Sequence, residues 1–347
     1  MKTVNLGPVP VGDAHPVVLI AEIGTFFNQD VELARHYLAQ IAATGVPVFK
    51  TEILHDADVC LKSGNLQYTF THAGGKKAED YRALIERKVV PLSGYAQIFA
   101  ACRELKMPFI ASVYDFEGID FLVKEGGVAV KIARHNITHH PLIAHAARSG
   151  LPVIFDAGVV YLDELSAAVR VAQREGAEVI INHHPGANPT PPERHHLRIV
   201  QTYKQTFDVP VGLSCHYRGD ELLYAAVGVG VNMIEKGVVD DNTRVEQDVV
   251  SALNLSDLKT FHQKLLNCSA ALGERTPQIT EPRDLSTRKG LVARKPIAAG
   301  DKLTLDNVGF AWPPVGINVE QWDAVSGKAA IRAIPAGEPV QSGDVNI

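Results

Sequence analysis

Cysteine is scarce in this sequence, and its spacing is irregular. The 347 residues include four cysteines, and none of them forms a C-x-x-C pair: Cys60, Cys102, Cys215 and Cys268. This spacing argues against a disulfide framework and against a structural zinc site. A core of this size needs no disulfides to stabilise it. We therefore expect free thiols and a cytoplasmic location.

Long apolar runs and basic blocks are also missing. No apolar run approaches the roughly 20 residues that would span a bilayer. Residues 1–16 are polar and interrupted by glycine and proline, unlike a signal peptide or a membrane anchor. The formal net charge is −5, and lysine and arginine do not cluster. We therefore predict neither a membrane nor a nucleic-acid partner.

What is present is a regular alternation of continuous apolar runs and amphipathic stretches. Such runs are typical of buried parallel strands, and the alternation indicates βαβ units. There are eight strand–helix units, the number that closes a (β/α)8 TIM barrel, and this regularity favours closure over a doubly wound open sheet. The expected strands cover residues 17–22, 46–52, 108–113, 128–133, 152–157, 178–183, 209–214 and 231–236. The expected helices cover residues 31–44, a segment from about 91, and 116–124, 141–149, 162–175, 192–207, 220–227 and 255–272.

The chain divides by composition into three parts. We expect the barrel at residues 1–275, a linker at 276–287 and a small, mostly β domain at 288–347. In the small domain, residues 288–304 predict two short strands with a turn at 299–301, and residues 329–340 repeat this pattern weakly. Within the barrel, the long connection after Glu52 is either a functional lid or an insertion with its own helix at 78–87.

Ionisable side chains stand where the expected strands end. The strand in V-A-V-K-I-A-R-H-N at 128–136 contains a lysine, and a buried lysine needs a partner such as a carboxylate or a bound anion. Active sites of this barrel class lie at the carboxyl ends of the strands. Any one of these residues could belong to a satisfied ion pair at the barrel rim, but the whole set predicts an active site. The set is Glu22, Lys50, Glu52, Ser112, Asp115, Lys131, Arg134, Asp156, His183, His184, Ser214, Cys215, His216, Glu235 and Lys236.

These side-chain types suit an anionic small molecule that reacts with a polar partner. The basic groups can hold phosphate and carboxylate oxygens. The histidines can bind a divalent metal or move protons. Glu22 and Glu235 can orient a polyol or act as acid or base.

Several motifs, in order along the chain, resemble the N-acetylneuraminate (sialic acid) synthase family. They are V-L-I-A-E-I-G, V-A-V-K-I-A-R-H-N-I-T-H-H-P-L-I, T-P-P-E-x-x-x-L-R, V-P-V-G-L-S-C-H and M-I-E-K. The tail, with G-L-V-A-R-K-P-I-A-A-G-D-K-L-T and V-S-G-K-A-A-I-R-A-I-P-A-G-E-P-V, resembles that family's antifreeze-like (SAF) domain. A divergent member of the spore-coat polysaccharide type is one form that this resemblance can take.

The resemblance implies a TIM-barrel enzyme for surface polysaccharide biosynthesis. It would condense phosphoenolpyruvate with an N-acylated amino-sugar aldehyde and yield a 2-keto-3-deoxy sugar acid and phosphate. It also implies a divalent metal, typically manganese, and a homodimer in which the small domain covers the partner's barrel mouth.

The resemblance also implies roles for individual residues. Lys50 and Lys131 would hold phosphoenolpyruvate, and Glu22 would face the reacting centre. The catalytic set is Glu22, Lys50, Lys131, Glu235 and Asp248. The substrate-binding set adds Ser112, Arg134, Asp156, His183, Asn188, Ser214 and Trp312.

The chain departs from the family pattern at the metal and sugar positions. His216 would be a metal ligand, but Gly237 stands where the second histidine is usual. Trp312 aligns with the arginine expected to reach the sugar. Two alternatives therefore stay open: a member that binds phosphoenolpyruvate or a related anion without condensation, and a metal-independent aldolase on the same barrel. Substitute metal ligands would come from His183, His184, Cys215 and Asp156.

Overall fold

The computed structural model of this chain describes residues 2–62, 65–273 and 286–346. The chain forms two compact units, Met1–Gly273 and Glu274–Ile347. The predicted barrel end at 275 lies close to this division. Of the predicted linker, residues 276–285 lie outside the described residues.

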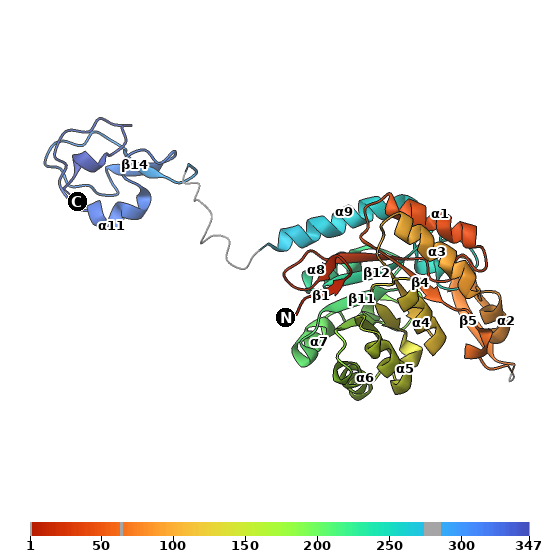
Figure 1. The fold of residues 1–347 in the computed structure, drawn as a ribbon. Helices are drawn as coiled ribbons and strands as arrows, with labels where there is room; N and C mark the ends of the chain where they lie inside the picture. The colour runs from red at the N-terminus through yellow and green to blue at the C-terminus, as the bar shows by residue number, and fades with distance from the viewer. Residues whose placement is uncertain (1, 63–64, 274–285, 347) are drawn as a thin grey trace. The chain divides into compact units, whose positions relative to one another are not determined.

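The first unit is built on eight parallel strands that close into a barrel (Figure 1). Parallel pairing of residues 212–215 with residues 233–236 closes the ring, and the predicted TIM barrel is thereby confirmed. In chain order the barrel strands are β3 (Val18–Glu22), β4 (Val48–Ile53), β7 (Phe109–Val113), β8 (Val130–Ile132), β9 (Val153–Gly158), β10 (Val179–His184), β11 (Val211–Cys215) and β12 (Met233–Val239). A two-residue strand, β13 (Leu253–Asn254), pairs with the end of β12.

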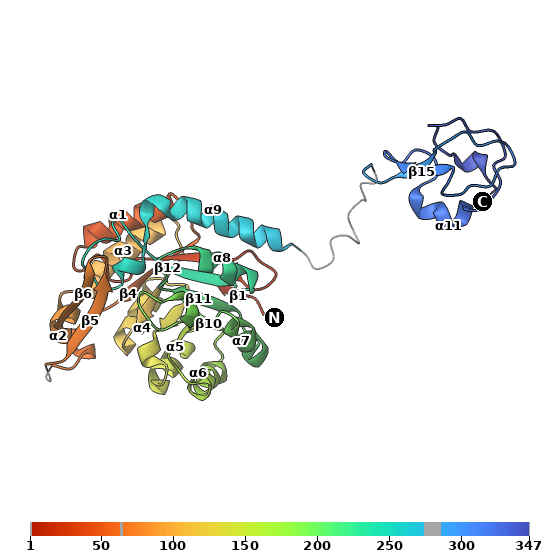
Figure 2. The ribbon, with the colours of Figure 1, turned by 180° about the vertical axis from the view of Figure 1, so that it is seen from behind.

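Helices surround the barrel and bury their apolar faces against it. The last of them lies beside the first, which joins the two ends of the barrel unit (Figures 1 and 2). They are α1 (Val31–Ala42), α3 (Leu92–Glu104), α4 (Phe116–Lys124), α5 (His140–Arg148), α6 (Leu162–Arg174), α7 (Ile199–Phe207), α8 (Glu221–Gly228) and α9 (Leu255–Leu272). In the described ranges, none of the helices has the length and apolarity needed to cross a membrane.

One predicted helix is interrupted. Residues 192–207 form a short 3-10 turn, η3 (Pro192–Arg194), and then α7. Between them the backbone of His196 is left-handed, with φ of 42°. A left-handed residue cannot continue a right-handed helix, so the pattern breaks there.

A hairpin that the sequence reading missed closes the amino-terminal end of the barrel. Strands β1 (Val4–Leu6) and β2 (Val9–Val11) pair antiparallel. Their apolar side chains pack with the first residues of the barrel strands, such as Val18 and Val48. The open end of the barrel is therefore the carboxyl end, where the predicted site residues stand.

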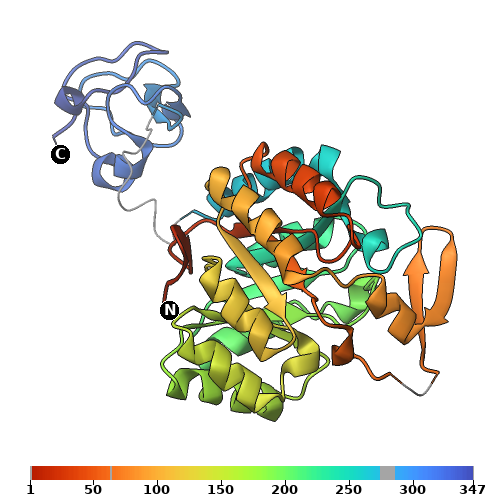
Figure 3. The ribbon, with the colours of Figure 1, turned by 45° about the vertical axis from the view of Figure 1, so that its right-hand side comes forward.

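The long connection after β4 forms a second hairpin. It contains η1 (Ala57–Val59), β5 (Gln67–His72), β6 (Gly75–Asp80) and α2 (Tyr81–Glu86). The helix is shorter than predicted, because Asp80 caps it by accepting a bond from the Ala83 amide at 2.9 Å. Figure 3 shows the hairpin, in orange, beside the segment that follows β12. Gln247 of that segment donates to the Tyr68 hydroxyl at 3.3 Å.

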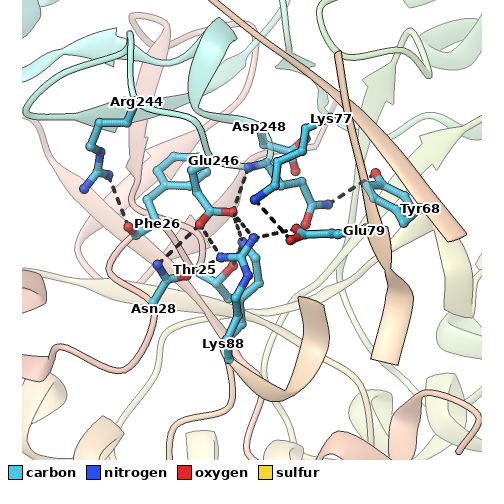
Figure 4. A network of polar contacts seen from close by, with 12 residues as sticks. Thr25, Phe26, Asn28, Tyr68, Lys77, Glu79, Lys88, Arg244, Glu246 and Asp248 are labelled. Atoms are coloured by element: carbon cyan, nitrogen blue, oxygen red, sulfur yellow. Dashed lines mark hydrogen bonds and ion pairs between the residues drawn. The ribbon is translucent and has the colours of Figure 1, made fainter. Parts of the chain in front are cut away.

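Glu246 ties three segments together next to this hairpin (Figure 4). Its carboxylate accepts from Arg87 Nη2 at 3.0 Å and lies 3.3 Å from Lys88 Nζ. It also accepts from Asn28 Nδ2 at 3.3 Å. Arg87 in turn donates to Glu79 of β6 at 2.7 Å. This network joins the loop after β3, the end of α2 and the loop after β12.

The small unit has its own apolar core and little regular structure. Strands β14 (Gly290–Ala293) and β15 (Val308–Ala311) pair antiparallel. Its short helical turns are η5 (Val319–Gln321), α11 (Trp322–Val325) and η6 (Ser342–Asp344). Of the two short strands predicted within 288–304, the first is present as β14, whereas in the second Lys302 forms an isolated bridge with Ala329.

The predicted turn and the weak repeat are both present in the small unit. The Asp301 amide donates to the Ala298 carbonyl at 3.0 Å, and Gly300 has φ of 92°. In the second copy of the repeat, residues 329–340, Gly337 has φ of 84°. Ile297 and Ile334 exchange backbone hydrogen bonds of 2.9 and 2.8 Å, which pairs the two copies.

We expect Glu246→Gln to lower the free energy of unfolding near pH 7 by about 2–4 kcal/mol, since it leaves buried cations without their counter-charge. Arg87 and Lys88 lower the pKa of Glu246 to about 2 although burial alone would raise it. The difference in unfolding free energy between the wild type and Glu246→Gln should therefore reach its full size above about pH 4.5 and shrink as the pH falls toward 2. Urea unfolding at several pH values measures it. Glu32→Gln, which removes an exposed ion pair with Arg35, is the control and should change stability far less. An equal loss of unfolding free energy in both variants would contradict the stabilising role assigned to Glu246.

Candidate active site

A cavity of about 300 Å³ opens at the carboxyl ends of the barrel strands. Most of the predicted site residues line it, because side chains at strand ends and in the loops that follow converge there. The lining residues that the sequence predicted are Glu22, Glu52, Ser112, Lys131, Arg134, Asp156, His184, Asn188, Ser214, His216, Glu235 and Asp248.

Two buried lysines form the base of this site. Lys50 is fully buried beneath the cavity, where it donates to Glu22 Oε1 and lies 3.5 Å from Glu235 Oε1. Lys131 is 2% exposed, and its Nζ lies 2.5 Å from Glu235 Oε1 and 3.5 Å from Asp156 Oδ1. Glu235 therefore stands between the two ammonium groups and neutralises charge from both.

The carboxyl groups of this cluster titrate in opposite directions. Burial raises the pKa of Glu22 to about 8, against the opposing effect of Lys50. Burial would also raise the pKa of Glu235, but Lys131 and Lys50 lower it to about 2. Lys131 likewise lowers the pKa of Asp156 despite its burial. Near pH 7, two ammonium groups thus face two carboxylates, and Glu22 is mostly neutral.

Further polar groups hold Glu235 in place. Ser214 Oγ donates to its Oε1 at 3.2 Å. Asn182 Nδ2 donates to its Oε2 at 3.2 Å, and this fully buried amide was not predicted. The available signal was its position on β10, two residues before His184 and so on the same face of the strand.

Asp156, His184 and His216 form a line along one wall. Asp156 Oδ2 lies 3.4 Å from His184 Nδ1, and His184 Nε2 lies 2.9 Å from His216 Nδ1. Gly158 makes room for this arrangement, because a Cβ there would lie 2.5 Å from His184 Nδ1. Burial lowers the pKa of His216 well below its usual range, so this imidazole is neutral.

Two loop segments complete the walls. Asp248 stands before η4 (Val249–Ser251) and accepts from Asn188 Nδ2 at 2.6 Å. Burial raises the pKa of Asp248. Arg134 begins η2 (Arg134–Asn136), directly after β8, and its Nη1 donates to the Gly186 carbonyl at 3.3 Å.

The structure corrects two predictions. His183 points to the helix layer, where its Nε2 lies 2.7 Å from the His195 carbonyl and its ring meets Tyr203. Cys215 also points outward, with its Sγ 3.8 Å from His195 Nε2. Successive side chains of a strand face opposite sides, so residues next to cavity-facing ones cannot share the cavity. His183 as a substrate-binding residue, and both as substitute metal ligands, are therefore wrong.

Trp312 belongs to the second unit, so its role in substrate binding stays a prediction. It is 70% exposed, and Lys289 Nζ lies 5.3 Å from its ring centroid.

Several cavity residues that come from the long connection were not predicted, and three of them are Tyr68, Tyr81 and Lys88. Tyr68 and Tyr81 line the cavity, and their rings stack at 5.2 Å. Lys88 also lines it and donates to Thr25 Oγ1 at 3.0 Å. None of them stands at the end of a barrel strand, so strand-end reasoning could not find them.

The side chains present do not fit the two-histidine metal site implied by the resemblance. In the described part of the chain, no group of three or more His, Cys, Asp or Glu side chains is arranged to hold a metal ion. A Cβ on Gly237 would lie 3.3 Å from two ring carbons of Phe26, so Phe26 fills the direction that a longer side chain would take. Manganese stays a prediction.

Comparisons with known proteins agree with this fold. An uncharacterized protein of Methanocaldococcus jannaschii is 28% identical over 92% of this chain and 92% of its own length. The pseudaminic acid synthase of Helicobacter pylori is 25% identical over 95% of this chain and 98% of its own. The crystal structure of an N-acetylneuraminic acid synthetase from Leptospira borgpetersenii, in complex with citrate, matches with a TM-score of 0.72 at 22% identity. That match covers 81% of this chain and 93% of the other.

Family models give the assignment. The model of the NeuB family matches residues 38–277, well over half of the chain. The model of the SAF domain matches residues 288–346. This chain therefore belongs to the NeuB family and carries a SAF domain in its second unit.

Proposed function

We propose that this protein condenses phosphoenolpyruvate with an N-acylated amino-sugar aldehyde, forming a 2-keto-3-deoxy sugar acid and phosphate for surface polysaccharide. Membership of the NeuB family and similarity to the pseudaminic acid synthase support a sugar-acid synthase, a transferase that forms a carbon–carbon bond. The homodimer, the cytoplasmic location and manganese stay predictions beside this proposal.

The observation that carries the proposal is the pair of buried lysines at the base of the cavity. Lys50 and Lys131 are buried at 0% and 2% exposure and are compensated by carboxylates from the same barrel. An incoming anion can share Lys131, whose ammonium group has three donors. Phosphoenolpyruvate has the carboxylate and phosphate oxygens that such cations bind.

The reaction requires one new carbon–carbon bond and three proton movements. Carbon 3 of phosphoenolpyruvate attacks the aldehyde carbon, and the aldehyde oxygen takes up a proton. Glu22 suits this donation because it is mostly neutral near pH 7 and lines the cavity. Water then adds at carbon 2 and loses one proton. The carbon–oxygen bond to phosphate breaks as the remaining hydroxyl loses its proton to the departing phosphate, which releases phosphate and the ketone.

The histidine line suits the second proton movement. An ionised Asp156 favours a proton on His184 Nδ1, which leaves Nε2 to accept from His216 Nδ1. His216 Nε2 then carries a lone pair, and His216 lines the cavity. We assign it the uptake of the proton that the attacking water loses.

A second candidate is a member that binds phosphoenolpyruvate or a related anion without condensation. The observation that favours it is Phe26, which packs beside Gly237 where the family has a histidine. Binding of the anion without turnover would separate this candidate from the first.

We expect phosphate release from phosphoenolpyruvate to depend on one aldehyde in a panel of amino sugars. The measurement is phosphate release in protein treated with a chelator, with and without added manganese. Release with one sugar supports the synthase, and the manganese arm tests the metal prediction. Tight binding of phosphoenolpyruvate without release for any sugar would favour the second candidate.

We expect Lys131→Ala to weaken phosphoenolpyruvate binding about 10- to 100-fold, since a charge-assisted hydrogen bond contributes about 1.5–3 kcal/mol. Calorimetric titration measures the affinity. The matched control is Lys204→Ala, which removes another buried lysine, paired with Asp13 outside the cavity. It should lower stability and leave the affinity unchanged. An unchanged affinity in Lys131→Ala would refute the assigned role.

We expect phosphoenolpyruvate affinity to fall as the pH rises through about 8, because ionised Glu22 adds negative charge next to the bound anion. Affinity should be nearly constant between pH 7 and 7.5 and fall by up to about tenfold per pH unit above the pKa of Glu22. Titrations from pH 7 to 9.5 measure it. In Glu22→Gln the fall should disappear, and a fall that persists in this variant would assign it to another group.

A further inference from the structure

Arg134 differs from the other cations around the cavity. Lys50, Lys88 and Lys131 each have a carboxylate oxygen within 3.5 Å. In the described part of the chain, no carboxylate lies within 4.0 Å of a side-chain nitrogen of Arg134. Its one side-chain hydrogen bond runs from Nη1 to the Gly186 carbonyl, at 3.3 Å.

The guanidinium of Arg134 therefore has donors to spare. It carries five N–H donors in a planar fork that matches two oxygens of a phosphate or carboxylate. The side chain is half-buried and lines the cavity. The hydrogen bond from Arg134 to the Gly186 carbonyl orients the guanidinium, since it ties the turn after β8 to the loop after β10.

The neighbours of Arg134 place it on the hairpin side of the cavity. Burial raises the pKa of Tyr68 and Tyr81, and the positive charge of Arg134 opposes this rise in both. Both phenols belong to the hairpin segment and line the same cavity. Their hydroxyls add neutral donors to the cavity that Arg134 lines, which suits an oxyanion with several oxygens.

The charge balance of the cavity points the same way. The deep lysines are compensated by Glu235 and Asp156. Asp248 lines the cavity too, but its Oδ1 accepts from Asn188 at 2.6 Å. An anion that enters the cavity therefore finds at Arg134 a fixed, positively charged fork without a carboxylate to displace.

We propose that Arg134, with Tyr68 and Tyr81, forms an oxyanion subsite that binds a phosphoryl or carboxylate group of a substrate. This inference rests on the proposed condensation for the identity of the substrates. The group is either the phosphate of phosphoenolpyruvate or an acidic group on the acceptor sugar, distant from its aldehyde.

The test compares Arg134→Ala and Arg134→Lys with the wild type. Calorimetric titration with phosphoenolpyruvate and with inorganic phosphate measures binding without turnover. Phosphate release is then measured with a pair of amino-sugar aldehydes that differ by a 6-phosphate. Arg103→Ala is the matched control, because Arg103 pairs with Glu125 on the helical surface outside the cavity.

We expect Arg134→Ala to weaken binding of the relevant anion about tenfold or more, and Arg134→Lys to restore part of the loss because it keeps the charge without the fork. Weaker phosphoenolpyruvate binding assigns the subsite to its phosphate. Unchanged phosphoenolpyruvate binding with a lost preference for the phosphorylated acceptor assigns it to the acceptor.

The proposal is overturned if Arg134→Ala and Arg103→Ala bind both anions like the wild type and keep the same acceptor preference. Thermal unfolding of each variant separates a binding defect from misfolding, and Arg134→Lys keeps the test readable if the alanine variant unfolds. If no aldehyde is turned over by the wild type, the condensation fails while the phosphate titrations still decide the subsite.

Discussion

The burial of two positive charges inside one barrel is the constraint on which this site depends. Lys131 and Lys50 come from β8 and β4, and both approach Glu235 of β12, at 2.5 and 3.5 Å. Removing one partner from a buried pair typically costs about 3–5 kcal/mol, because a charge is left without compensation. The three residues therefore hold one another in place, and barrel closure brings them together.

The same compensation gives the cavity its chemistry. Carboxylates that neutralise the lysines in the free protein leave their ammonium groups able to share an anion that enters. Glu22 stays mostly neutral beside this cluster, since burial raises its pKa to about 8. A neutral acid next to the lysine ammonium groups is the arrangement that a proton donor needs near pH 7.

The wall of the cavity depends on a second ion-pair network, in which Glu246 ties the hairpin segment to the barrel loops.

Two glycines of the barrel unit lie close to large side chains. Asp156 and His184 stand on neighbouring strands, and they lie in one line with His216. Gly158 leaves the space that the imidazole of His184 needs. Gly237 lies instead against Phe26, where a longer side chain would meet the ring. Residues that are far apart along the chain are therefore parts of connected arrangements in the barrel.

The sequence by itself determined the barrel, because each strand and helix has a local apolar period that does not depend on its neighbours. It also determined which strand ends carry charge, and Lys131 and Glu235 could be predicted as site residues. Only the tertiary structure decided which side chains face the cavity. Strand pleat turned His183 outward, and the long connection, which has no barrel period, brought Lys88 to the wall. Contacts between distant segments decide such placements, and no local pattern encodes them.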